Sequence, residues 1–306
     1  MHSARTLSLA AAFVVAMTTG FAAIAAAAAD AAGAASQSAA APSGSATPGP
    51  VLADVVAGDW RKPEARARDV YRHPAECLTF WGLRPGMTIL EVQPGGAAWW
   101  TEMLAPYAKR TGGRLYVTGS DLGNPALSDA ARKARADFEA HFAADPALYG
   151  SITILDWGPV SAPLPKDTFD LIITARNVHN WMGTPGWVDK VFREFFAALK
   201  PGGVLGLEEH RANPGPQDPK ASSGYVTEAY VVEAAEKAGF KLAGKSEVNA
   251  NPKDSKDHPF GVWTLPPNLR STPYGSSQSD DPSFDHSKYV AIGESDRMVL
   301  RFVKQK

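Results

Sequence analysis

Residues 88–104 read Thr-Ile-Leu-Glu-Val-Gln-Pro-Gly-Gly-Ala-Ala-Trp-Trp-Thr-Glu-Met-Leu, and this stretch decides the fold class. A buried strand is predicted from its apolar positions Ile89, Leu90 and Val92, and a Pro-Gly-Gly turn and a helical pattern follow at once. Glycine at such a turn lets a ligand approach the backbone closely, because no Cβ stands in the way. The following helix offers unpaired N–H groups and a partial positive charge. The stretch therefore predicts a nucleotide-type ligand at the carboxyl edge of an α/β sheet.

The turn does not have the glycine spacing of a dinucleotide-binding fold. That fingerprint has the form G-x-G-x-x-G, whereas Gly95 and Gly96 are followed here by Ala-Ala-Trp-Trp. Glycine turns of purely structural purpose are also common after strands in α/β proteins, so the turn alone leaves both interpretations open. The order of the later landmarks distinguishes them.

Strands and helices alternate along the chain as far as residue 208. The apolar patterns predict further strands at 115–121, 151–157, 169–175, 204–208, 240–248 and 297–303. Helices are predicted at 63–80, 101–108, 128–144 and 230–239, and from the Thr184-Pro185 cap to Leu199. This alternation predicts an α/β fold with a doubly wound, mostly parallel sheet of seven strands, the last one antiparallel. Residues 249–294, rich in Pro, Ser, Asp and Asn, form a long irregular insertion.

The first 50 residues indicate export. Residues 1–29 combine an early arginine with a long apolar run and a small-residue end, which is the pattern of a cleaved signal peptide. Left uncleaved, this stretch is long enough to anchor the protein in a membrane. Residues 30–50 are rich in Ala, Ser, Gly and Pro and predict a flexible linker. We therefore expect a periplasmic or secreted protein with one large domain at 51–306.

Charge and cysteine content exclude several kinds of partner. The formal net charge is −1 and the pI is about 6.7, so nothing favours nucleic acid or, once the signal is cleaved, a membrane surface. Cys77 is the single cysteine, which excludes an intrachain disulfide and a thiolate-rich zinc site. Asp254, Asp257 and His258, taken with His210, lack a recognisable ligand spacing, so no metal is expected. A small-molecule substrate is the expected partner.

The ordered landmarks resemble the class I S-adenosylmethionine-dependent methyltransferases. The resemblance spans about residues 74–302 and is carried by Ile89–Gly96, Asp121, Asp156, Leu164-Pro165, Phe169–Ile173, Leu199–Leu205 and Glu236–Phe240. The Leu-Lys-Pro-Gly-Gly element at 199–203 is the most specific single piece. The closest likeness is a subgroup of predicted exported bacterial methyltransferases, to which residues 209–211 and 296–302 are also similar. The family likeness implies a Rossmann-like methyltransferase fold with S-adenosylmethionine as its cofactor.

The resemblance also assigns cofactor contacts. It implies that the methionine part lies against Glu91, Gly95 and Gly96, the ribose against Asp121, and the adenine against Asp156 and Trp157. Two departures from the family pattern lie in the turn. Ala97 stands where the family usually has glycine, and Gln93-Pro94 replaces a pair of small residues.

Polar residues that follow the fourth and fifth strands supply the candidate chemistry. His179 is the leading candidate for a base or substrate-orienting residue, because histidine exchanges protons near neutral pH. His210 paired with Glu209 is the alternative base, and a structural role is open for each. The candidate substrate-binding residues are Asn180, Trp181 and Tyr225.

Methyl transfer from S-adenosylmethionine to an unidentified small molecule is therefore the leading functional hypothesis. The first alternative is a periplasmic binding protein that kept the methyltransferase fold and lost catalysis, because Ala97 and export both depart from the usual pattern. The second is a nicotinamide-dependent oxidoreductase, which the missing third glycine disfavours.

Overall fold

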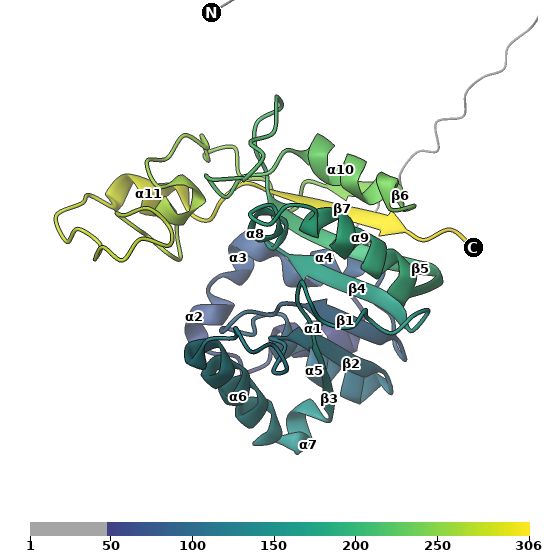
Figure 1. Cartoon of the computed structure of the whole chain (residues 1–306). Helices are drawn as coiled ribbons and strands as arrows, with labels where there is room; N and C mark the ends of the chain where they lie inside the picture. The colour runs from purple at the N-terminus through teal and green to yellow at the C-terminus, as the bar shows by residue number, and fades with distance from the viewer. Residues whose placement is uncertain (1–47) are drawn as a thin grey trace, which may run out of the picture. The chain divides into compact units, whose positions relative to one another are not determined.

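A seven-stranded sheet runs through residues 48–306, the part of the chain that the computed structural model describes (Figure 1). The strands are β1 (Thr88–Val92), β2 (Arg114–Gly119), β3 (Ile152–Asp156), β4 (Phe169–Ala175), β5 (Leu199–His210), β6 (Lys241–Ser246) and β7 (Arg297–Val303). Their order in the sheet is β3-β2-β1-β4-β5-β7-β6. Neighbours from β3 to β5 pair in parallel, and β7 is antiparallel to both β5 and β6. The α/β fold with an antiparallel last strand is therefore confirmed.

Strand β5 is longer than the sequence pattern predicts. The Lys-Pro-Gly-Gly element was expected to end a helix and precede the strand, but it lies within β5, where the register against β4 shifts between Phe169 and Leu171. At its other end β5 extends to His210, which pairs with Arg297 of β7. Glu209 and His210 are therefore held on a rigid strand and not on a loop.

Helices fill the connections. They are α1 (Pro50–Val56), α2 (Pro63–Arg66), α3 (Asp69–Arg72), α4 (Pro74–Phe80), α5 (Thr101–Thr111), α6 (Asp129–Ala143), α7 (Pro146–Tyr149), α8 (Val178–Trp181), α9 (Trp187–Ala198), α10 (Glu228–Lys237) and α11 (Ser287–Ile292), with a 3₁₀ helix, η1 (Gly261–Thr264). The single helix predicted at 63–80 is wrong. His73 is left-handed, with φ 39°, and separates α3 from α4, which begins at Pro74. The predicted cap of α9 is also wrong, because the left-handed Gly186 precedes its first residue, Trp187.

Two apolar cores cover the two faces of the sheet. One lies under α8, α9 and α10 and contains the predicted stripe Val188, Val191, Phe192 and Phe195. The other lies under α1, α4 and α5 and includes Trp81, Trp99 and Trp100. With both faces buried, the open positions of this sheet are its edges, and a ligand is expected at the carboxyl ends of the strands.

The carboxyl ends of β1, β4 and β5 bring three segments together. Residues 93–98 follow β1, residues 176–181 follow β4, and His210 ends β5. Residues 249–294, which include η1 and α11, are otherwise irregular, as the sequence predicts. Within 48–306 no helix is both long enough and apolar enough to cross a membrane. The predicted signal peptide and residues 30–47 of the predicted linker lie outside the described residues.

Candidate functional site

The turn after β1 is held in an unusual backbone conformation. Gln93, Gly95 and Ala98 all have positive φ, at 49°, 69° and 46°, whereas Ala97 does not. The backbone N–H of Gln93 donates to the Thr118 hydroxyl at 2.8 Å, which ties the turn to β2. At Gly95 and Gly96 a Cβ would meet no atom within 4 Å, so these two glycines border open space. We call this turn the glycine cradle. Its non-glycine residues with strained, positive φ are Gln93 and Ala98, whereas Ala97, which stands where the family usually has glycine, is not strained.

This turn forms one wall of a cavity with a volume of about 850 Å³. The ends of β2 and β3 and one side of α6 form the other walls, with Gly119, Phe138, Ile154 and Trp157 among the lining residues. Small-molecule sites are typically about 300–1,000 Å³, mostly apolar, with a few polar groups that fix orientation. The cavity therefore has the size and the walls for a nucleoside-containing ligand.

The predicted cofactor residues are placed around this cavity in different ways. Gly95, Gly96 and Trp157 line it directly. Asp156 lies behind the wall and binds Arg135, a lining residue, at 2.9 Å. Asp121 is not among the lining residues, because its carboxylate accepts from Ser161 Oγ at 2.6 Å and from the Gly123 N–H at 2.9 Å. In this arrangement Gly119 and Ser120, and not the Asp121 side chain, face the cavity from the end of β2.

A second cavity, of about 260 Å³, adjoins the first and shares Gln93, Pro94, Gly95 and Trp99 with it. Its walls are polar and come from the ends of β1, β4 and β5. They include Glu91, Arg176, Asn177, His179 and His210. Trp263, Asn268 and Tyr274 close it from the irregular segment 249–294, which gives that segment a place at the site.

His179, Glu209 and His210 form a buried cluster beside the smaller cavity. The Nδ1 of His179 lies 2.9 Å from Glu209 Oε1, and the backbone N–H of His179 donates to Glu209 Oε2 at 3.3 Å. The N–H of His210 donates to Glu209 Oε1 at 2.8 Å. Glu209 thus fixes the His179 ring with its Nδ1–H as the donor, which leaves Nε2 as the proton acceptor on a ring that lines the cavity.

His210 differs from His179 in its surroundings. Burial, the nearby His179 and Arg297 together lower the pKa of His210 well below its usual range. Its Nδ1 lies 2.5 Å from Ser295 Oγ. A histidine of strongly lowered pKa is a weak proton acceptor near neutral pH. The geometry therefore favours His179 over His210 as the base, with Glu209 as its positioning residue.

The same three residues are the group, within 48–306, whose ligand atoms lie close enough to hold a metal ion, within 4.8 Å of one another. Both Glu209 oxygens already accept N–H groups, and His210 Nδ1 is engaged by Ser295. The hydrogen bonds of the cluster are thus accounted for by Glu209 orienting the His179 ring and by Ser295 contacting His210. The Asp254 and His258 pair considered from the sequence lies 2.8 Å apart and is hydrogen-bonded to Tyr225, not to His210.

Glu91, at the carboxyl end of β1, lines the smaller cavity. Its Oε2 accepts from the Thr101 hydroxyl at 2.7 Å, and its buried Oε1 has no partner among the described residues. Burial raises the pKa of Glu91 from 4.5 to about 8, so the side chain carries a proton at neutral pH. The unpartnered oxygen of this neutral carboxyl group is available for a hydrogen bond with a ligand.

The three predicted substrate-binding residues separate in the structure. Asn180 lines the smaller cavity. Trp181 does not; its Nε1 donates to Gln93 Oε1 at 2.8 Å, and its ring packs against Trp157 and Phe195 in the core. Tyr225 is also buried away from the cavities and donates its hydroxyl to Asp254 at 3.0 Å. The structure gives Trp181 and Tyr225 structural contacts and no place in the cavity wall.

Sequence reasoning missed Arg176 and Tyr274 as lining residues, whereas it considered Trp263 for a substrate pocket, which Trp263 lines. Arg176 directly follows β4, at the strand end where ligands bind in α/β sheets, so its position carried a usable signal. Trp263 and Tyr274 lie in the patternless segment, and their rings stack with centroids 4.3 Å apart and planes 10° apart. No local pattern indicates that pairing.

Comparison with known proteins agrees with this geometry. Residues 95–207 match the family model described as a methyltransferase domain. No curated protein sequence matches the chain. The fold is similar to that of the [4+2]-cyclase SpnF, with 17% identity and a TM-score of 0.52 over 83% of this chain and 92% of that one. A SAM-dependent methyltransferase from Aquifex aeolicus shows 19% identity and a TM-score of 0.44 over 65% of this chain and 93% of that one.

The sheet order, the glycine cradle and the paired cavities define the class of protein as a Rossmann-like fold of the methyltransferase type. Residues 95–207, which run from the cradle to β5, match the methyltransferase-domain model, and this match implies S-adenosylmethionine as the cofactor. The residues present fit that cofactor, since the open glycines and the larger cavity accommodate a nucleoside and Glu91 offers an unpaired oxygen.

Proposed function

We propose that the protein transfers a methyl group from S-adenosylmethionine to a small molecule held in the 260 Å³ cavity. The observation that carries the proposal is the adjacency of the two cavities, which share the residues of the glycine cradle. One cavity fits the cofactor, and the other presents a histidine fixed by a buried carboxyl group. S-adenosylmethionine would supply a methyl group on its sulfonium: an oxygen or nitrogen of the acceptor forms a bond to the methyl carbon, the carbon–sulfur bond breaks, and S-adenosylhomocysteine leaves.

The residues of this chain have three tasks in such a reaction. Gly95, Gly96 and Trp157 would hold the cofactor, and Glu91 lines the smaller cavity beside the cradle. His179 Nε2 accepts the proton that the acceptor loses, while Glu209 holds the ring. Positioning of the two reactants contributes up to about 7–11 kcal/mol to lowering the barrier. A correctly placed base adds about 10²–10⁴-fold.

Cofactor binding is tested by titrating the full chain with S-adenosylmethionine and S-adenosylhomocysteine in a calorimeter. We expect micromolar binding of both. Gly96→Leu is the matched variant, because a side chain at Gly96 enters open space without backbone strain and occupies the cavity. It should weaken binding at least tenfold and leave the melting temperature unchanged. Absence of binding to the wild-type chain would overturn the proposal.

Catalysis is tested by transfer of tritium from methyl-labelled S-adenosylmethionine to a mixed panel of small phenols, amines and carboxylic acids. His179→Ala should lower the transfer rate about 10²–10⁴-fold while S-adenosylhomocysteine affinity stays within twofold. Glu209→Gln should lower the rate less and shift its pH profile, because it acts through the orientation of His179. Cofactor binding with no transfer to any acceptor would favour the alternative, a binding protein that has lost catalysis.

The proposed site of action is the periplasm or the extracellular medium. The signal-like segment 1–29 and the resemblance to exported bacterial methyltransferases support it. Fractionation of cells that express the full chain should find it outside the cytoplasm and shortened at its N-terminus. Retention of an intact chain in the cytoplasm would refute the assignment.

A further inference from the structure

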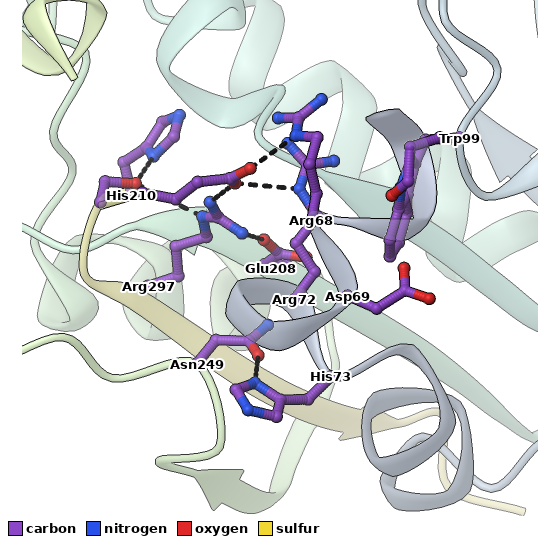
Figure 2. A network of polar contacts seen from close by, with 12 residues as sticks. Arg68, Asp69, Arg72, His73, Trp99, Glu208, His210, Asn249 and Arg297 are labelled. Carbon is purple, nitrogen blue, oxygen red and sulfur yellow. Dashed lines mark hydrogen bonds and ion pairs between the residues drawn. The ribbon is translucent and has the colours of Figure 1, made fainter. Parts of the chain in front are cut away.

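Four arginines and two glutamates gather behind the smaller cavity. Glu294 accepts from Arg68 at 2.5 Å and from Arg72 at 2.9 Å, and it also pairs with Arg297. Glu208 binds Arg297 at 3.1 Å. Figure 2 shows this network, with Trp99 on one side of the arginines and His210 on the other. The fourth arginine, Arg176, is close enough to these groups for Glu208, Arg297 and Glu294 to affect its pKa.

The cluster carries more positive than negative charge. Two carboxylates serve three guanidinium groups by direct contact, and Arg176 forms no ion pair or side-chain hydrogen bond with any residue of 48–306. Three guanidinium nitrogens are buried without a partner, namely Arg68 Nη2, Arg72 Nη2 and Arg176 Nε. Arg72 is 1% exposed. A guanidinium donor held away from water without a partner is costly, so an anion that reaches Arg176 would stabilise the cluster.

Arg176 is the residue of this cluster that a ligand in the smaller cavity can contact. This residue directly follows β4, is left-handed at φ 60°, and is tied to β5 by its N–H, which donates to Glu208 O at 2.8 Å. Its side chain lines the smaller cavity together with His179, His210 and Asn180. Glu91, the one carboxyl group on the same wall, is protonated at neutral pH because burial raises its pKa to about 8. No negative charge on that wall opposes an anion.

From this arrangement, and resting on the proposed function, we propose that the methyl acceptor is a small organic anion. Its carboxylate or phosphate group is bound by Arg176, which forms charge-assisted hydrogen bonds to it while the acceptor's reacting atom lies toward His179. Arg68 and Arg72 act from behind, as a source of positive potential that Glu208 and Glu294 do not cancel. Arg176 is therefore a specificity-determining residue of the acceptor site.

A second source of the same chemistry is the carboxylate of the cofactor's methionine part. The lining residues argue for the acceptor, since Arg176 lines the smaller cavity and not the larger one, whereas Arg68 lines the larger one. The experiment therefore needs one arm for each source.

Benzoate and benzamide serve as probes, because they have nearly the same shape and differ in charge. Their dissociation constants are measured with the full chain, with and without saturating S-adenosylhomocysteine, and inorganic phosphate is titrated in parallel. The wild-type chain should bind benzoate about 10–100-fold more tightly than benzamide, as expected for hydrogen bonds to a charged group. Arg176→Met should abolish this preference. Arg193→Met, which removes an exposed arginine on α9, should preserve it.

Three results would overturn the proposal. The first is that wild-type chain binds neither benzoate nor phosphate. The second is an unchanged benzoate preference in Arg176→Met. The third is that Arg176→Met weakens S-adenosylhomocysteine but not 5′-methylthioadenosine, which lacks the carboxylate, because this would assign Arg176 to the cofactor. If the wild-type chain fails to bind S-adenosylhomocysteine, the proposed function fails, and the titrations without it still decide the anion site.

Discussion

The two cavities lie side by side and are built on opposite physical principles. The larger one has mostly apolar walls from the turn after β1, the ends of β2 and β3, and α6, with charged side chains such as Arg135 and Asp137 among them. The smaller one is walled by histidines, asparagines and Arg176, with buried ion pairs behind it. The first site relies on shape and apolar contact, whereas the second relies on fixed charge and oriented hydrogen bonds.

The difference indicates that the larger cavity serves cofactor binding in general, whereas the smaller cavity determines which acceptor this protein takes. A cradle that lacks side chains at Gly95 and Gly96 suits any ligand with the cofactor's outline. A buried network with excess positive charge is expensive to maintain and selects among acceptors by charge. The fold alone does not determine the chemistry, since a protein described as a [4+2]-cyclase has a similar fold. We therefore expect specificity to reside in the smaller cavity and its supports.

The largest effect should come from removing the shared partner of the buried arginines. Glu294→Gln leaves Arg68, Arg72 and Arg297 facing one another, and the loss of unfolding free energy should be about 3–5 kcal/mol. Lys237→Gln is the control; it breaks an exposed pair with Asp189 and should cost less than about 1 kcal/mol. Urea denaturation of both variants measures this. Equal losses of unfolding free energy in the two variants would show that Glu294 does not offset repulsion among the buried arginines.

The stability of the fold at low pH should also depend on this network of arginines and Glu294. Burial acts to raise the pKa of Glu294, but Arg297, Arg72 and Arg68 outweigh it and hold the pKa well below its usual range. A carboxyl group whose pKa is lowered on folding stabilises the fold above its unfolded pKa, and this contribution is lost as pH falls through the folded pKa. The wild-type chain should therefore lose stability below about pH 4.5, and Glu294→Gln should lose less. Parallel acid curves would contradict the lowered pKa.

Glu91 should have the next largest effect on the free energy of unfolding, and this effect depends on pH in the opposite direction. Its pKa is raised from 4.5 to about 8 by burial, so the folded state holds the proton more tightly than the unfolded state. Its contribution to stability is complete below pH 4.5 and is lost as pH rises to about 8, at up to about 1.4 kcal/mol per pH unit. Glu91→Gln cannot ionise, so its stability relative to the wild-type chain should increase over this window. Urea denaturation at pH 5, 6.5 and 8 measures the difference, and a constant difference would contradict the buried, protonated state.

The sequence predicted the strands and the turn after β1 better than it predicted the charge network behind the smaller cavity. Strand β4 and the cradle after β1 follow from local patterns, an apolar run and a glycine turn, and local patterns are what a single sequence displays. The pairing of Arg72 with Glu294 joins residues 222 positions apart and has no local signature. Tyr225 shows the converse error, because an aromatic residue suggested a pocket wall and the fold instead buried it against Asp254. Long-range charge pairing and the path of an irregular segment are properties of the assembled chain.

The smallest effect tests whether the irregular segment belongs to the acceptor half. Tyr274 is 59% exposed, lines the smaller cavity and stacks on Trp263, so Tyr274→Ala should remove an aromatic contact of about 0.5–1.5 kcal/mol. We expect benzoate affinity to fall about two- to tenfold while S-adenosylhomocysteine affinity stays unchanged, because Tyr274 does not line the larger cavity. Tyr274→Phe keeps the ring and should restore the affinity. If Tyr274→Ala weakened both ligands equally, the segment would cover the whole site, and the division between a general and a particular half would not hold.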